Sequence, residues 1–143
     1  MTLFRNGHLY PTAIALAPPS GQRVPFVEVE MAGAPGLLRP VVGKLDTGAF
    51  MTILTFSTAK ALGIGDPKLN CLRQDTAQVA NGGSLPYYVH PVSITVPNPA
   101  GADLGFVLEA GFAEHVPLNL FGMDWVQHLC AAIDKQQVHL LRD

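Results

Sequence analysis

The sequence predicts an all-β domain with one or two short helices, closed or sandwiched around a single core. Twelve prolines and fourteen glycines divide the 143 residues into short segments, which favours short strands over long helices. Residues 27–31 alternate apolar and acidic side chains, a period of two that is typical of a half-buried strand. An Asn-Gly-Gly turn at 81–83 separates two extended stretches, as in a β-hairpin.

Further strands and two short helices are expected in order along the chain. A first helix is expected at 55–62. Thr55 or Ser57 would be its N-cap, and Gly63 would be its stop signal. A second helix is expected at 123–130, where apolar residues recur on one face. The other expected strands span residues 8–16, 37–45, 52–54, 76–80, 85–96, 104–110, 116–121 and 138–141.

Length and composition narrow the domain organisation and the classes of partner. Residues 1–143 are expected to form one domain, in which 1–23 is an N-terminal extension or a first strand. The nine Lys and Arg form no basic stripe, so nucleic acid is not an expected partner. No apolar run approaches the roughly 20 residues that cross a bilayer, and we therefore expect no membrane segment. No signal peptide is recognisable, which predicts a cytoplasmic location.

The cysteines and histidines give no sign of a metal centre. Cys71 and Cys130 are the only cysteines, and they lack the close spacing of zinc ligands. The five histidines have no pairwise spacing suited to a metal. We therefore expect neither a metal nor a cofactor. The two cysteines are interpreted as separate thiols, with a disulfide as the open alternative.

The candidate for chemistry lies in segment 41–49, where an apolar stretch ends in Asp46-Thr47-Gly48. This places a carboxylate at the point where a strand meets a glycine-containing turn. The tripeptide alone is weak evidence, because so short a motif also arises by chance. An ordinary polar turn is the alternative interpretation.

Two later features accompany this motif in order and spacing. Segment 79–83 has the pattern of a hairpin tip, and segment 120–125 contains an apolar pair, then Gly-x-Asp, then the start of a short helix. With these features the chain resembles the retropepsin-like aspartic proteases, single-domain relatives of the viral polyprotein-cleaving enzymes. The resemblance runs from about residue 24 to residue 138. It implies the closed acid-protease barrel of that family, with one or two short helices.

The resemblance implies a role for each residue of the motif. Asp46 would be the catalytic carboxylate, and Thr47 would hydrogen-bond across a dimer axis to the partner's loop. Gly48 would leave room for the substrate backbone, and Ala49 would complete the active-site loop.

The resemblance also implies a flap and a supporting segment. The flap would close over the substrate, whereas Gly122 would let the C-terminal helix approach the active-site loop closely. We interpret Asp124, at a helix start, as a cap or a partner for backbone amides rather than as a second catalytic acid. The expected flap-tip residues are Ala80, Asn81, Gly82 and Gly83.

The chemistry implied by the resemblance needs two chains. Peptide hydrolysis of this kind uses two carboxylates that share one proton and flank one water. The chain contains a single Asp-Thr-Gly, and a two-fold axis would bring Asp46 and its symmetry mate together. We therefore expect a homodimeric aspartic endopeptidase that acts on peptide or protein substrates. The alternative is a peptide-binding or dimerisation module that keeps the fold with little proteolysis.

Two positions depart from the viral pattern. Viral members usually carry Asp directly after Asp-Thr-Gly-Ala and Arg after the C-terminal Gly, whereas this chain has Phe50 and Met123. Both replacements are apolar, so no buried charge is left unpaired. We infer that Phe50 belongs to the substrate-binding surface and that the outer subsites prefer apolar side chains. The alternative is that Phe50 packs into the core.

Overall fold

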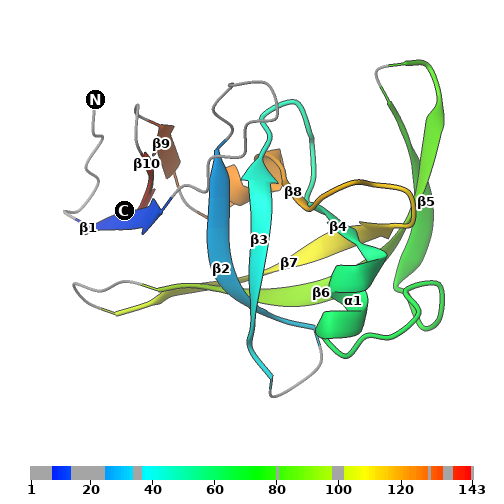
Figure 1. Cartoon of the computed structure of the whole chain (residues 1–143), viewed down its shortest axis with the longest axis horizontal. Coiled ribbons are helices and arrows are strands. Elements are labelled where there is room, and N and C mark those ends of the chain that lie inside the picture. The colour runs from blue at the N-terminus through cyan, green and yellow to red at the C-terminus, as the bar shows by residue number, and fades with distance from the viewer. Residues whose placement is uncertain are drawn as a thin grey trace.

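The computed structural model describes residues 8–13, 25–33, 37–79, 81–97, 102–128, 130–133 and 137–142. The described chain is mostly β, with one short α-helix and one 3-10 helix, η1 (Figure 1). In chain order the elements are β1 (His8–Ala13), β2 (Phe26–Ala32), β3 (Arg39–Leu45), β4 (Ile53–Thr55), α1 (Phe56–Ala61), β5 (Arg73–Gln78), β6 (Ser84–Val96), β7 (Leu104–Ala113), β8 (Leu120–Phe121), η1 (Met123–Gln127), β9 (Cys130–Ile133) and β10 (Gln137–Arg142).

The larger sheet forms a ring. Its seven strands run in the order β2-β3-β8-β4-β7-β6-β5, and β2 also pairs with β6. This additional pairing closes the circuit from β2 to β6, so that β5 lies outside the ring and, among the described strands, pairs with β6 alone. Most pairings are antiparallel, but β3 with β8 and β4 with β7 run parallel. The mostly-β class predicted from the alternating pattern is therefore confirmed.

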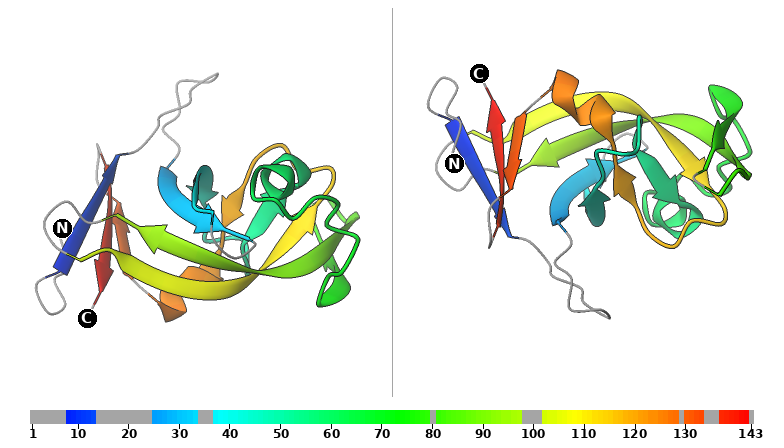
Figure 2. Two further views of the ribbon diagram at one scale, coloured as in Figure 1. Left: turned by 90° about the horizontal axis from the view of Figure 1, so that it is seen from below. Right: turned by 90° about the horizontal axis from the view of Figure 1, so that it is seen from above.

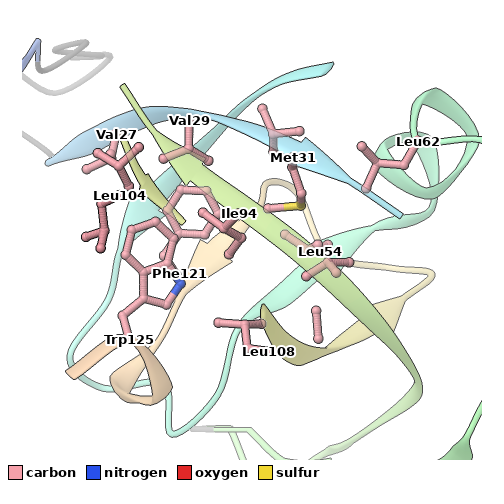
Figure 3. Packing of buried hydrophobic residues seen from close by; sticks show 14 of the residues in the cluster. Val27, Val29, Met31, Leu54, Leu62, Ile94, Leu104, Leu108, Phe121 and Trp125 are labelled. Carbon is pink, nitrogen blue, oxygen red and sulfur yellow. The ribbon is translucent and has the colours of Figure 1, made fainter. Parts of the chain in front are cut away.

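The core fills the inside of this ring. On β2, Val27, Val29 and Met31 are buried while Glu28 between them is exposed, as the alternation in the sequence predicts. Trp125 completes the core from the C-terminal side, and its indole stacks on a phenyl ring of β8 at a centroid distance of 4.5 Å (Figure 3). The largest fully buried side chains are Trp125, Phe112, Phe121, Met31, Leu54, Ile94, Leu140, Val27, Val29 and Val89.

The first helix has the predicted boundaries within one residue. α1 spans Phe56–Ala61, and the hydroxyl of Thr55 accepts a hydrogen bond from the backbone N–H of Thr58. Of the two candidate N-caps, Thr55 is therefore the one used. Gly63 follows the helix with φ at +80°, a left-handed conformation that glycine adopts without steric cost and that ends the helix.

Two predicted elements near the C-terminus are shorter than expected. The strand expected at 116–121 is confined to Leu120–Phe121, the residues that stand in register with β3 and β4. The helix expected at 123–130 is a 3-10 helix that ends at Gln127, and Cys130 already belongs to β9. A helix extended to residue 130 would take Cys130 out of β9. The backbone hydrogen bonds between β9 and β10 that involve this residue would then be lost.

The first and the last two described strands form a separate three-stranded sheet. The order is β1-β10-β9, with both pairings antiparallel. This sheet lies at one end of the long axis of the molecule, and the β5–β6 hairpin lies at the other end (Figure 2). Because β10 is the central strand, it cannot also pair with a second subunit in this arrangement. Within the described part of this sheet, the edges open to a partner strand are those of β1 and β9.

Candidate active site

Asp46 lies in a tight turn directly after β3. Its backbone N–H donates to the carbonyl of Phe121 at 2.9 Å, and its own carbonyl accepts from the N–H of Ala49 at 3.1 Å. The carboxylate Oδ1 accepts from the N–H of Gly48 at 2.9 Å. Asp46 is half-buried, whereas Thr47 and Gly48 are exposed. The turn therefore presents one carboxylate, held by a backbone amide, at the surface of the chain.

The strands on either side of this turn explain why the carboxylate is placed there. β3 runs parallel to β8, with Lys44 opposite Leu120 and Leu45 opposite Phe121. Gly43 makes this approach possible, because a Cβ at that position would lie 2.6 Å from the ring of Phe121. Because Gly43 has no side chain, the ring of Phe121 can pack beneath β3. The backbone carbonyl of Phe121 then accepts the hydrogen bond from the Asp46 N–H.

Gly122 lies in close contact with the active-site loop. A Cβ at this position would lie 2.4 Å from the carbonyl oxygen of Met51 and 2.7 Å from that of Ala49. These are backbone atoms, so no side-chain rotation could relieve the overlap. The N–H of Met123 donates to the Ala49 carbonyl at 2.8 Å. The segment that begins at Gly122 is thus packed against the loop, the close approach that the resemblance implies for this glycine.

Asp124 binds the chain just after that loop. Its two carboxylate oxygens accept from the backbone N–H and from the hydroxyl of Thr52, at 2.8 and 2.9 Å. Asp124 is therefore a partner for a backbone amide, as its position in the sequence suggested. Thr52 was not recognised from the sequence, although a polar side chain inside the apolar stretch 51–54 was an available signal.

The predicted flap is a hairpin built from β5 and β6. At its tip, Val79 and Gly83 are linked by a backbone hydrogen bond of 3.0 Å, and the side chain of Asn81 accepts from the N–H of Gly83 at 2.9 Å. Gly82 has φ at +84°, the left-handed conformation that a tight turn requires of one of its residues. Ala80 lies outside the described residues.

This hairpin extends beyond the ring. β6 pairs with β5 from Ser84 onward but with β7 only from Tyr88 onward. Strand pairing therefore joins this part of the hairpin to the ring through β6. In Figure 1 the hairpin rises toward the top of the view, where the loop that follows β3 also lies.

A second apolar cluster connects the base of the hairpin with the active-site loop. Tyr87 of β6 lies over Gly111 of β7, where a Cβ would be 2.9 Å from the tyrosine ring and 3.2 Å from the Met51 side chain. Burial raises the pKa of Tyr87, and the neighbouring Asp75 carboxylate raises it further. The phenol is therefore neutral near neutral pH and can donate to Asp75. The buried members of this cluster are Met51, Ile53, Tyr87, Val89 and Ala113.

Phe50 and Met123 are exposed apolar side chains beside the carboxylate loop. Phe50 is 63% exposed and Met123 is 41% exposed. Their backbones are adjacent, since the N–H of Met123 binds the carbonyl of Ala49. The interpretation in which Phe50 packs into the core of its own chain is therefore wrong.

Within the described ranges, no three His, Cys, Asp or Glu side chains are grouped so that they could hold a metal ion. Cys71 carries a free thiol. No helix in the described part of the chain combines the length and the apolar character needed to span a membrane.

Comparisons with known proteins bear on the fold. No protein-family model matches the chain, and no curated protein matches it. Among solved structures, a retropepsin-like aspartic protease from Rickettsia conorii is similar over 93% of this chain and 89% of its own, with 18% identity and a TM-score of 0.58.

Two further structures are similar at lower TM-scores. The EIAV protease complexed with the inhibitor HBY-793 has 19% identity and a TM-score of 0.49, with 78% of this chain and 92% of that chain covered. The retroviral protease-like domain of Ddi1 from Leishmania major has 20% identity and a TM-score of 0.40, with 80% and 93% covered. At such identities a likeness shows the fold alone, and the Rickettsia structure, aligned over most of both chains, is the one that carries it. The chain has a retropepsin-like fold.

Proposed function

We propose that this chain is one subunit of a homodimeric aspartic endopeptidase. The observation that supports the proposal is the setting of Asp46, a surface carboxylate in a turn that is fixed on both sides by backbone hydrogen bonds. Such a turn holds an acid side chain in a defined direction while leaving it accessible to substrate. The likeness in fold to a retropepsin-like aspartic protease agrees with this assignment.

The reaction would proceed by activation of water between two Asp46 carboxylates. The ionised carboxylate takes a proton from the water as its oxygen attacks the peptide carbonyl, while the protonated partner donates a hydrogen bond to the carbonyl oxygen. The two carboxylates would contact the same water and would therefore lie close together. They share one proton because like charges so close cannot both ionise. The carboxyl group that took the proton from water then gives it to the leaving nitrogen, the C–N bond of the tetrahedral intermediate breaks, and the pair is again left with one proton. One chain supplies only one of the two acids, so the active unit is a dimer.

The remaining site residues would hold the substrate and the second subunit. Thr47 and Gly48 are exposed at the turn, where the threonine hydroxyl can bind the partner's loop and the glycine admits the substrate backbone. The hairpin tip at 81–83 would close over an extended peptide. Such a peptide binds chiefly through main-chain hydrogen bonds, as an added strand does.

The test of this function is cleavage by the purified chain at different subunit concentrations. Unstructured polypeptide should be cut, and below the dimer dissociation constant the rate should rise with the square of the subunit concentration. Sedimentation measured at the same concentrations identifies the species present. Cleavage by a population that sediments only as monomer would contradict the two-chain site.

Phe50 is expected to set the side-chain preference of an outer subsite. Because it is exposed beside the carboxylate loop, replacing it with Ala should lower kcat/KM about tenfold for peptides with large apolar side chains at that subsite, relative to peptides with small ones. Cleavage-site profiling of a peptide mixture measures this ratio. Leu69, also 63% exposed but in the segment after α1, provides the matched control Leu69→Ala, which should leave the profile unchanged.

The same variant separates this role from its alternatives. A surface substitution should change the free energy of unfolding by less than about 0.5 kcal/mol. If Phe50→Ala instead lowers the melting temperature and leaves the cleavage profile as it was, its role is in packing. If it weakens dimerisation with no change of profile, the partner subunit covers this side chain.

A further inference from the structure

Thr52 is a fully buried polar residue at the centre of a hydrogen-bond network behind the active-site loop. Its side chain has no exposed surface. The Thr52 carbonyl accepts from the N–H of Gly111 at 3.0 Å, which ties it to β7. Its N–H and its hydroxyl both contact Asp124. A buried polar group without partners is costly, and here every polar group of Thr52 has one.

The direction of each bond around the Thr52 hydroxyl follows from its neighbours. The indole Nε1–H of Trp125 donates to Oγ1 at 3.0 Å, and the backbone N–H of Gly122 approaches the same oxygen at 3.4 Å. Neither group can act as an acceptor. These two donors occupy both lone pairs of Oγ1, so the hydroxyl hydrogen is left for the Asp124 Oδ1 at 2.9 Å.

Asp124 must therefore accept on both of its oxygens. The backbone N–H of Thr52 donates to Oδ2 at 2.8 Å, and the hydroxyl donates to Oδ1. An ionised carboxylate offers two acceptor oxygens, whereas an Asn side chain of the same shape offers one acceptor and one NH₂ group. Because the indole of Trp125 donates to the Thr52 hydroxyl oxygen, that hydroxyl must itself donate to the side chain at position 124. A carboxylate can accept this bond together with the one from the Thr52 N–H, whereas an amide cannot accept both with separate oxygens.

The network fixes the segment that carries the active-site turn. Thr52 directly follows Met51, whose carbonyl lies against Gly122, and Met123 binds Ala49 from the same side. These contacts hold residues 49–52 in a fixed position against residues 122–125. A shift of one segment along the other would move the turn that contains Asp46.

We propose that Thr52 and Asp124 are positioning residues for the reaction, acting through an ionised carboxylate whose charge is stabilised by the Thr52 N–H and hydroxyl. This inference rests on the proposed function, since it assigns these residues a part in holding the Asp46 turn. It goes beyond general structural support, because it predicts that Asn cannot replace Asp124 without loss of activity. The predicted cause is the indole of Trp125, which donates to the Thr52 hydroxyl oxygen and leaves it unable to accept from the Asn amide.

The test is a double-mutant cycle between Asp124→Asn and Trp125→Phe. Asp124→Asn should lower kcat at least tenfold, with KM within about twofold and an unchanged dimer, because a small misplacement of the reacting group has effects of this size or larger. In Trp125→Phe the hydroxyl oxygen regains a free lone pair, so it can accept from the Asn amide. The double variant should therefore lose less activity, and less stability toward urea, than the two single losses combined.

A second pair of variants keeps the proposal testable if Asp124→Asn does not fold. Thr52→Ser retains the hydroxyl and should keep kcat within about twofold, whereas Thr52→Val preserves the shape and should lose activity to a similar extent as Asp124→Asn. Asp66→Asn removes an exposed carboxylate near α1 and should behave as the wild type.

Each outcome decides a separate point. Wild-type kcat in Asp124→Asn, or equal kcat in Thr52→Ser and Thr52→Val, overturns the positioning role. If the losses of Asp124→Asn and Trp125→Phe simply add in the double variant, the donor and acceptor roles assigned around the Thr52 hydroxyl are wrong. A wild type that cleaves nothing overturns the proposed function and with it the positioning role, while the coupling in urea unfolding still decides the bond directions.

Discussion

Replacing Asp46 by Asn is expected to lower kcat by about 10²–10⁴-fold, the contribution of a positioned general acid or base. Asn has nearly the same shape and can still accept from the Gly48 N–H that binds Asp46 Oδ1 at 2.9 Å. The turn should therefore keep its conformation, while the side chain can no longer take a proton from water. Hydrolysis of a peptide substrate measures the loss, and sedimentation should show that the dimer is intact.

Mixing the variant with the wild type tests whether two copies of Asp46 form one site. If they do, heterodimers lack one acid, so the activity per wild-type subunit should fall as Asp46→Asn protein is added in excess. If each chain acts alone, that activity will stay constant. Asp66→Asn protein, which changes an exposed carboxylate elsewhere, is the control for adding a second folded chain, because its heterodimers with the wild type should stay active and the activity per wild-type subunit should not fall. Peptide binding without any cleavage by the wild type would support a binding module instead.

Replacing Gly122 by Ala is expected to destabilise the chain by about 3 kcal/mol, near the upper end for overpacking. The new Cβ would lie 2.4 and 2.5 Å from the carbonyl oxygen and carbon of Met51 and 2.7 Å from the Ala49 oxygen. Because these are backbone atoms, only a shift of the loop or of the η1 segment can relieve the contact. The loss of stability should be accompanied by loss of activity, since the displaced loop carries Asp46.

Gly105→Ala is the matched control for this substitution. Gly105 is an exposed glycine of β7, and a Cβ there would have its nearest contact at 3.9 Å. The free energy of unfolding should change by less than about 1 kcal/mol. Both variants are compared by urea unfolding at one subunit concentration, because dimerisation makes stability depend on concentration. Equal stabilities for Gly122→Ala and the wild type would show that the close packing at Gly122 is absent in solution.

The elements that depend on local pattern could be predicted from the sequence. The alternation of Val27, Val29 and Met31 with acidic residues identified β2 and its buried face. Thr55 and Ser57 as candidate N-caps and Gly63 as a stop signal marked the ends of α1 within one residue. The turn at 81–83 identified the hairpin. In each case the signal and the structure involve neighbouring residues.

The elements that depend on distant contacts could not be predicted in this way. The short length of η1 follows from the pairing of β9 with β10, because Cys130 already belongs to β9. β9 exists because β10 pairs with it, and no period in the sequence indicates that pairing. The role of Thr52 was missed for the same reason, since its partners come from segments far along the chain.

The residues of the candidate site were recognised from the sequence, but their positions relative to one another were not. Asp46, Gly122 and the hairpin tip were recognised as separate motifs in the right order. Their relation depends on parallel pairing of β3 with β8, which places Asp46 beside Phe121, and on the absence of a side chain at Gly43. The exposure of Phe50 likewise required the structure, because an apolar side chain after a strand is equally compatible with a core position.

The most direct test of the two-chain site is a crystal structure of the wild-type protein in which the two nearest Asp46 carboxylates are located. We expect a two-fold axis to relate them and each carboxylate to lie about 2.6–3.2 Å from one shared water. A structure in which Asp46 faces solvent alone, with no packing of subunits that brings two copies together, would contradict it.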